Sequence, residues 1–235
     1  MFNRVIVAVV GSSNSGKTTA VEALIKGLKK RGYIVASAKH IHDDEFTIDT
    51  EGKDTWRYAK AGAKFVLSVS PKEMTIIKKF DTKEYGLEQI VGGIPDEVDI
   101  TLLEGFKSLV AQNASIPKLV TANTVNEITA ASELYKNILA FISPIPNEKV
   151  EAKIPCVDVL KDPQKLVDLV IDKVAVLVER KRKREAKITI QINHEFLPLG
   201  DFVQSFIKNS VLAMVSSLKG VEIEGEEKVS IVIKR

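Results

Sequence analysis

The chain has 235 residues, of which 45% are apolar and 28% charged, a composition that supports a buried core and excludes an intrinsically disordered protein. Its 34 basic and 31 acidic residues leave a formal charge of +3, a surplus too small to indicate a nucleic-acid-binding protein. The one cysteine, Cys156, excludes an intrachain disulfide, and no apolar run approaches the ~20 residues of a membrane-spanning helix, so we expect a cytoplasmic protein.

Strands and helices alternate from the first residues to about residue 178. The predicted strands are short runs rich in β-branched residues, at 4–10, 33–38, 64–70, 74–80, 98–103, 118–122 and 138–142. The predicted helices cover 17–31, 55–60, 84–91 and 128–134, and a last long helix begins at Asp162 as N-cap with Pro163 in its first turn. This alternation predicts an α/β fold with a mostly parallel sheet covered by helices on both faces.

The pattern changes near residue 179. Residues 179–187 hold six basic and two acidic residues, which indicate either a solvated helix end or a patch for an anionic ligand or RNA. Beyond them we expect a strand at 187–193, a helix at 201–218 and two strands at 221–223 and 228–233. The predicted organisation is a nucleotide-binding domain (1–178), a basic linker (179–187) and a small α+β domain of β-α-β-β order (188–235).

A phosphate-binding motif follows the first predicted strand. Residues 11–18 read G-S-S-N-S-G-K-T, which matches the P-loop pattern G-x-x-x-x-G-K-[ST] between a buried strand and an amphipathic helix. Its glycines allow a nest of backbone N–H groups, and the helix directs its positive end to the same place. We expect Lys17 to contact the β- and γ-phosphates and Thr18 to bind Mg²⁺. The predicted nucleotide-binding residues here are Gly11, Ser12, Ser13, Asn14, Ser15, Gly16, Lys17, Thr18 and Thr19.

A P-loop also needs an acidic residue at the end of a neighbouring strand. The buried strand at 98–103 delivers Glu104 to the carboxyl edge of the sheet, where α/β proteins bind ligands. Glu104 is therefore predicted to share the Mg²⁺ with Thr18 or to position a water, and with Lys17 it is the predicted catalytic pair. The alternative is that Glu104 only forms an ion pair with Lys107.

A long polar segment begins where the second predicted strand ends, at Lys39 and His40. His40, His42, Asp43 and Asp44 suggest a metal site, although a solvated charged loop explains the last three equally well. Trp56 and Tyr58 are expected to pack on the helix that follows this segment, and not to stack on a nucleotide base.

Several motifs in one order give this chain a specific resemblance. They are the P-loop, K-H-x-H from Lys39, D-x-x-G-K-D-[ST]-x-R from Asp49 to Arg57, A-G-A at Ala61 and L-L-E-G-F-K ending at Lys107. Together they resemble the molybdopterin-guanine dinucleotide biosynthesis protein B (MobB) family over roughly residues 1–175. The residues that match the family's characteristic loop are Lys39, His40, Asp49, Lys53, Asp54 and Arg57.

The resemblance implies a P-loop protein that binds GTP and Mg²⁺, forms a homodimer and hydrolyses GTP slowly. It implies an adaptor role when the partner nucleotidyltransferase, protein A, attaches a guanine nucleotide to molybdopterin or its tungsten counterpart. The chain departs from the pattern at H-I-H-D-D, where relatives often carry H-T-H-H, and it has no N-K-x-D motif for reading guanine. Asn123, at a strand end, is the candidate base contact.

Two other readings remain open. A small-molecule kinase or ATP-dependent ligase on the same loop would use Asp49 or Asp54 as base and Arg57 as a phosphate clamp. A non-catalytic, nucleotide-gated scaffold would recruit its client through the C-terminal residues.

Overall fold

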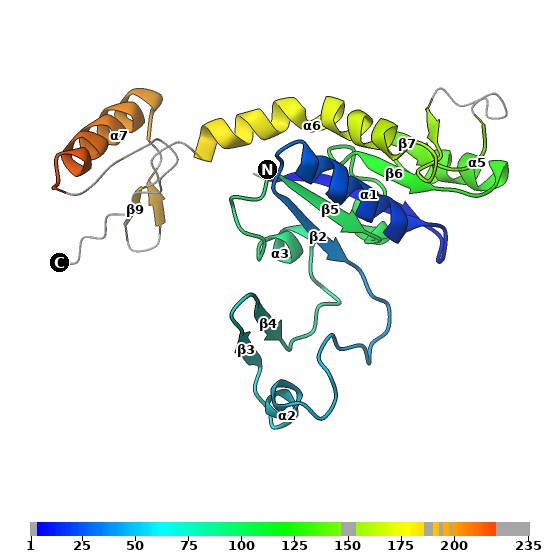
Figure 1. Ribbon diagram of the computed structural model, residues 1–235, viewed down its shortest axis with the longest axis horizontal. Helices are drawn as coiled ribbons and strands as arrows, with labels where there is room; N and C mark the ends of the chain where they lie inside the picture. The colour runs from blue at the N-terminus through cyan, green and yellow to red at the C-terminus, as the bar shows by residue number, and fades with distance from the viewer. Residues whose placement is uncertain (1–3, 147–153, 186–189, 193–194, 198, 220–235) are drawn as a thin grey trace. The chain divides into compact units, whose positions relative to one another are not determined.

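The computed structural model describes residues 4–146, 154–185, 190–192, 195–197 and 199–219 (Figure 1). It divides into two compact units, residues 1–175 and residues 176–235. Residues 179–185 of the predicted basic linker continue a long helix, α6 (Pro163–Glu185). In the part of the chain that the structure describes, no helix is both long and apolar enough to cross a membrane.

The first unit is built on one parallel sheet of six strands in the order β2-β5-β1-β6-β7-β8. The predicted α/β fold with a parallel sheet is therefore confirmed. Five of the six strands match predicted ones, whereas β8 is only two residues long and gives no pattern in the sequence. The strands are β1 (Val5–Gly11), β2 (Val35–Lys39), β5 (Ile100–Glu104), β6 (Lys118–Thr121), β7 (Ile138–Ile142) and β8 (Cys156–Val157).

Helices cover both faces of this sheet because both faces are apolar. Alternate residues of β1 (Ile6, Ala8 and Val10) are in one buried cluster with residues of α3, α4 and α5. The helices of this face are α3 (Leu87–Val91), α4 (Lys107–Val110) and α5 (Val125–Leu134). The other face carries α1 (Lys17–Lys30), whose buried stripe includes Leu24 and Leu28, and α6 lies beside α1 (Figure 1).

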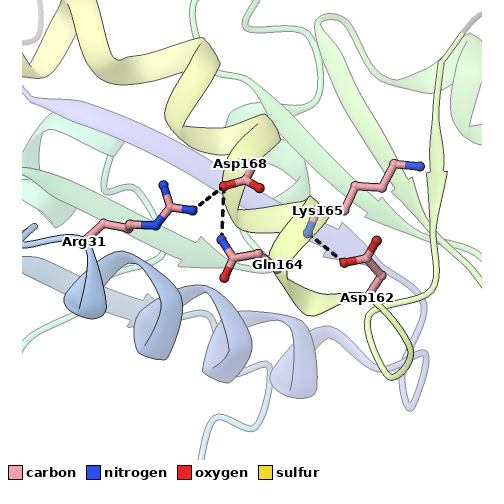
Figure 2. Close-up of polar contacts among 5 residues, drawn as sticks. All are labelled: Arg31, Asp162, Gln164, Lys165 and Asp168. Atoms are coloured by element: carbon pink, nitrogen blue, oxygen red, sulfur yellow. Dashed lines mark hydrogen bonds and ion pairs between the residues drawn. The ribbon is translucent and has the colours of Figure 1, made fainter.

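The contact between α1 and α6 is close. Gly27 of α1 faces Val167 of α6, and a Cβ on this glycine would lie 2.3 Å from a Val167 methyl group. Where α1 ends, Arg31 donates to the Asp168 carboxylate (2.7 Å), which also accepts from Gln164 (3.0 Å; Figure 2). Asp162 accepts from the Lys165 amide (3.0 Å), which is the N-cap contact predicted from the sequence.

The segment between β2 and β5 contains α2 (Asp54–Lys60), β3 (Phe65–Val69) and β4 (Met74–Lys78). The two strands were predicted, and they form an antiparallel hairpin apart from the six-stranded sheet. The four residues between them, 70–73, are too few for the crossover that a parallel pair requires.

The second unit contains a short antiparallel hairpin, β9 (Ile190–Ile192) with β10 (Glu195–Leu197), followed by α7 (Asp201–Ser216). The predicted β-α-β-β order therefore lacks the strand β10, whose three residues next to Pro198 are too few for an alternating pattern. The predicted strands at 221–223 and 228–233 lie outside the described residues.

Candidate functional site

The loop between β1 and α1 is held against the end of β6. Gly11 pairs with Thr121 across the sheet, and a Cβ on Gly11 would lie 1.9 Å from Thr121 Oγ1. The buried Ser15 hydroxyl donates to the Ser12 carbonyl (2.7 Å) and shares a hydrogen bond with Thr121 Oγ1 (2.5 Å). These hydrogen bonds hold the predicted loop in one turn, and Thr121 leaves room only for a glycine at position 11.

The loop ends in the first turn of α1. Gly16 is the N-cap at φ +90°, a left-handed conformation that glycine adopts without strain. Glycine has no side chain that could accept a hydrogen bond from the first amides of the helix. The N–H groups of Lys17, Thr18 and Thr19 therefore have no capping side chain. A helix N-terminus of this kind attracts anions.

Glu104 lies in contact with two other predicted site residues, Thr18 and Lys39. It ends β5, between Val9 of β1 and Lys39 of β2, and it is 9% exposed. Its Oε1 atom accepts from the Thr18 hydroxyl (3.1 Å) and pairs with Lys39 Nζ (3.1 Å). The ion-pair partner of Glu104 is therefore Lys39 and not Lys107, which was the alternative considered from the sequence.

Two other lysines, Lys39 and Lys107, lie close enough to Lys17 to lower its pKa. Its ammonium group donates to the Ser12 carbonyl. Burial lowers the pKa of Lys17; Glu104 opposes this effect, while Lys107 and Lys39 add to it. Lys107, the first residue of α4, was considered from the sequence only as an ion-pair partner of Glu104 and not as a residue of the nucleotide site. The signal was present in the L-L-E-G-F-K motif, whose last residue it is.

His40 continues from Lys39 along the same edge. Its backbone N–H donates to the Glu104 carbonyl (3.0 Å), and its ring lies 4.4 Å from that of His42 and 5.2 Å from that of Phe106, between centroids. Burial, and then the neighbouring His42, lower the pKa of His40. Gly105 allows His40 to lie close to the end of β5, because a Cβ at position 105 would lie only 3.3 Å from His40 Cβ.

The suggested metal cluster does not form among the described residues. Asp44 pairs with Lys83 (3.2 Å), and Asp43 accepts from the Glu45 amide (3.0 Å). No three His, Cys, Asp or Glu side chains in the described parts of the chain are placed to hold a metal ion.

The rest of the characteristic loop forms its own network. Asp49 accepts from the Thr55 hydroxyl (2.8 Å), Lys53 is the N-cap of α2, and Arg57 lies 3.8 Å from Asp54. Trp56 lies in the same helix under the Lys60 ammonium (5.2 Å to the ring centroid). These contacts stay within residues 47–61. They do not bring these four predicted residues to Glu104, so the base and clamp of the kinase alternative receive no support.

Asn123 lies at the turn between β6 and α5. Its side chain is exposed, and its backbone N–H donates to Glu127 Oε2 (2.6 Å). Glu127 in turn is in the first turn of α5, and its amide is capped by Thr124 (3.2 Å). The Asn123 backbone, Thr124 and Glu127 thus cap the start of α5, and the contact of Asn123 with a base stays a prediction.

Comparison with known proteins places these features in a family. The model of the family "Molybdopterin guanine dinucleotide synthesis protein B" matches residues 6–144, which include the glycine-rich loop, the characteristic loop and Glu104. The chain belongs to the MobB family. The resemblance drawn from the motifs is therefore confirmed.

Members of the MobB family match this chain over different lengths. A relative from Methanocaldococcus jannaschii, named as a molybdopterin-guanine dinucleotide biosynthesis adapter protein, is 27% identical over 98% of both chains. One from Bacillus subtilis with a similar name is 35% identical over 58% of this chain and 75% of its own. The archaeal match extends into the second unit, which the motif resemblance did not reach.

Solved MobB structures have the same fold. The crystal structure of Bacillus subtilis MobB superposes with a TM-score of 0.54 at 26% identity, covering 70% of this chain and 97% of its own. A MobB homologue from Bacillus stearothermophilus gives a TM-score of 0.54 at 21% identity, covering 74% and 99%, and supports the fold.

Proposed function

We propose that this chain is a GTP-binding adapter that supports the attachment of a guanine nucleotide to molybdopterin, with slow Mg²⁺-dependent GTP hydrolysis. The observation that carries the proposal is the contact of Thr18 and Lys39 with Glu104 beside the P-loop, where the charge of Glu104 also acts on Lys17. The names of the relatives supply the pathway, and the geometry supports the nucleotide.

The charges around the loop suit a triphosphate. The charges of Glu104, Lys107 and Lys39 all act on Lys17, and Lys39 pairs with Glu104. These four groups carry three positive charges against one negative charge. Burial and mutual repulsion lower the pKa of Lys17, and phosphate oxygens would relieve that repulsion. In this proposal Lys17 contacts the β- and γ-phosphates, and Lys39 and Lys107 lie at the γ-phosphate end.

The oxygens of Thr18 and Glu104 suit Mg²⁺. They lie 3.1 Å apart, and a hydroxyl with a carboxylate is the kind of donor set that Mg²⁺ uses beside phosphates. When bound, the ion would neutralise charge that develops on the phosphates. Glu104, held by two donors on one oxygen, would orient the water or ion.

Replacing Glu104 with glutamine tests this role. Because glutamine keeps the shape and loses the charge, we expect GTP hydrolysis to fall by about 100-fold while GTP affinity falls by less than about tenfold. Single-turnover hydrolysis and calorimetry measure the two effects.

The control must change a carboxylate that has no structural role. Asp99→Asn is no suitable control, because Asp99 is buried and accepts a hydrogen bond from the Ile34 amide (2.7 Å). Glu97→Gln, on an exposed residue before β5, is the matched control. Equal losses of binding and hydrolysis would contradict the assignment.

A homodimer is part of the proposal. One face of the β3–β4 hairpin exposes five apolar side chains that would be covered by a second copy. They are Phe65, Leu67, Val69, Met74 and Ile76, each 48–71% exposed. Sedimentation equilibrium measures the oligomeric state.

The adapter role is tested with the partner. Purified nucleotidyltransferase (protein A) with molybdopterin is assayed for guanylylation with and without this chain, in GTP and Mg²⁺. We expect a higher initial rate with the chain present and no gain with Lys17→Ala. No gain from the wild-type chain would rule out the adapter role.

A further inference from the structure

The order of the strands fixes the direction in which a nucleotide would lie. Glu104 of β5 and Lys39 of β2 are on one side of β1. Metal ions bridge the β- and γ-phosphates, so the γ-phosphate end belongs on this side. The nucleoside, at the other end of the phosphate chain, then extends toward β6, β7 and β8.

One row of residues crosses that half of the sheet. Gly11 pairs with Thr121, Thr121 with Ile142, and Ile142 with Val157. Neighbouring strands are about 4.8 Å apart, so Val157 lies roughly 14 Å from Gly11, a span comparable with an extended nucleoside triphosphate. The residue after Val157 is Asp158, at the carboxyl edge where parallel sheets bind ligands.

Asp158 is a carboxylate with acceptor capacity left. Its side chain is 21% exposed; Oδ1 accepts from the Leu160 amide (3.1 Å), and Oδ2 pairs with Lys161 (3.2 Å). Lys161 is 80% exposed, so its ammonium can move to solvent at little cost. Burial opposes ionisation of Asp158, but hydrogen bonds from Lys161 and Leu160 prevail and keep its pKa below the usual range.

We propose that Asp158 is the residue that selects guanine, by accepting hydrogen bonds from N1–H and the N2 amino group of the base. The inference rests on the proposed GTP binding and replaces Asn123, the candidate from the sequence. Guanine presents two adjacent N–H donors, which match the two oxygens of a carboxylate. Adenine presents a bare N1 acceptor at that edge, which a carboxylate repels. Glu127, at the start of α5, is engaged with the Asn123 amide.

Xanthine makes the test specific. It keeps N1–H but has a carbonyl oxygen in place of the amino group, so an amide side chain fits it and a carboxylate does not. Calorimetry in Mg²⁺ would compare GTP, ATP and xanthosine triphosphate binding to the full-length wild-type chain, to Asp158→Asn and to Asp162→Asn. Asp162→Asn is the matched control, because it removes the same charge four residues away and asparagine still caps α6.

We expect wild type to prefer GTP, and Asp158→Asn to lose about 10- to 100-fold in GTP affinity while xanthosine triphosphate affinity rises at least about tenfold. The control should keep the wild-type order. Unchanged GTP affinity in Asp158→Asn, or loss of both nucleotides without a gain, would overturn the inference. A wild type that binds no nucleotide would instead overturn the proposed GTP binding, and this inference with it.

Discussion

Lys17→Ala is expected to weaken GTP binding by about 100-fold or more, since charge-assisted hydrogen bonds to phosphate are among the strongest that a side chain makes. Lys17 is the first residue of α1, and it lies beside the loop whose Ser12 carbonyl accepts from its ammonium. Its removal would leave Lys39 and Lys107 to balance the phosphates, at the γ-phosphate end only. Isothermal titration calorimetry with GTP and Mg²⁺ measures the change.

The control for this experiment lies on the same helix. Lys26 is exposed and pairs with Glu22 at 3.9 Å, a surface contact that contributes little. Lys26→Ala removes the same charge from α1, so it separates contact with phosphate from the general field of the protein. If the two variants bound GTP equally well, Lys17 would have no direct role. Thermal unfolding of both without nucleotide should differ by little, because neither side chain packs in the core.

The residues predicted from the sequence that do meet in space share one property. Thr18, Lys39 and Glu104 each stand where a strand or helix begins or ends, and the carboxyl ends of parallel strands lie on one edge. A strand pattern is therefore sufficient to place them on this edge. Their pairing depends on strand order, because β5 lies between β1 and β2, and no local pattern gives that order.

Residues whose environment comes from distant segments were not predictable. Lys118 looks like an ordinary strand residue, yet it is fully buried and donates to the carbonyls of Asn113 (2.5 Å) and Lys136 (2.7 Å). Burial lowers its pKa to about 8. Asp158 was missed for a related reason: β8 has two residues, too few for periodicity, so nothing in the sequence marks Asp158 as the end of a strand.

Gly11→Ala is expected to disrupt the site and lower the stability of the fold together. The new Cβ would lie 1.9 Å from Thr121 Oγ1 and 2.7 Å from the Thr121 carbonyl oxygen. The hydroxyl could rotate away, but the carbonyl belongs to the backbone of β6, which pairs with Gly11. Either the β1–β6 pairing opens or the loop shifts. Overpacking of this kind costs about 1–3 kcal/mol, and the positive φ of +150°, which essentially only glycine adopts, adds about 1–3 kcal/mol.

Two further variants separate the possible causes of the loss of stability and GTP binding in Gly11→Ala. Gly32→Ala has a comparable penalty for its positive φ of +81° with open space around it, so it should cost about 1–2 kcal/mol and leave GTP binding intact. Gly11→Ala combined with Thr121→Ala removes the hydroxyl clash and keeps the carbonyl clash, so we expect only partial recovery. Urea unfolding and calorimetry measure both properties. If Gly11→Ala unfolded no more readily than Gly32→Ala, the close approach of β6 would not be what requires glycine there, and the loop would owe its shape to its own residues.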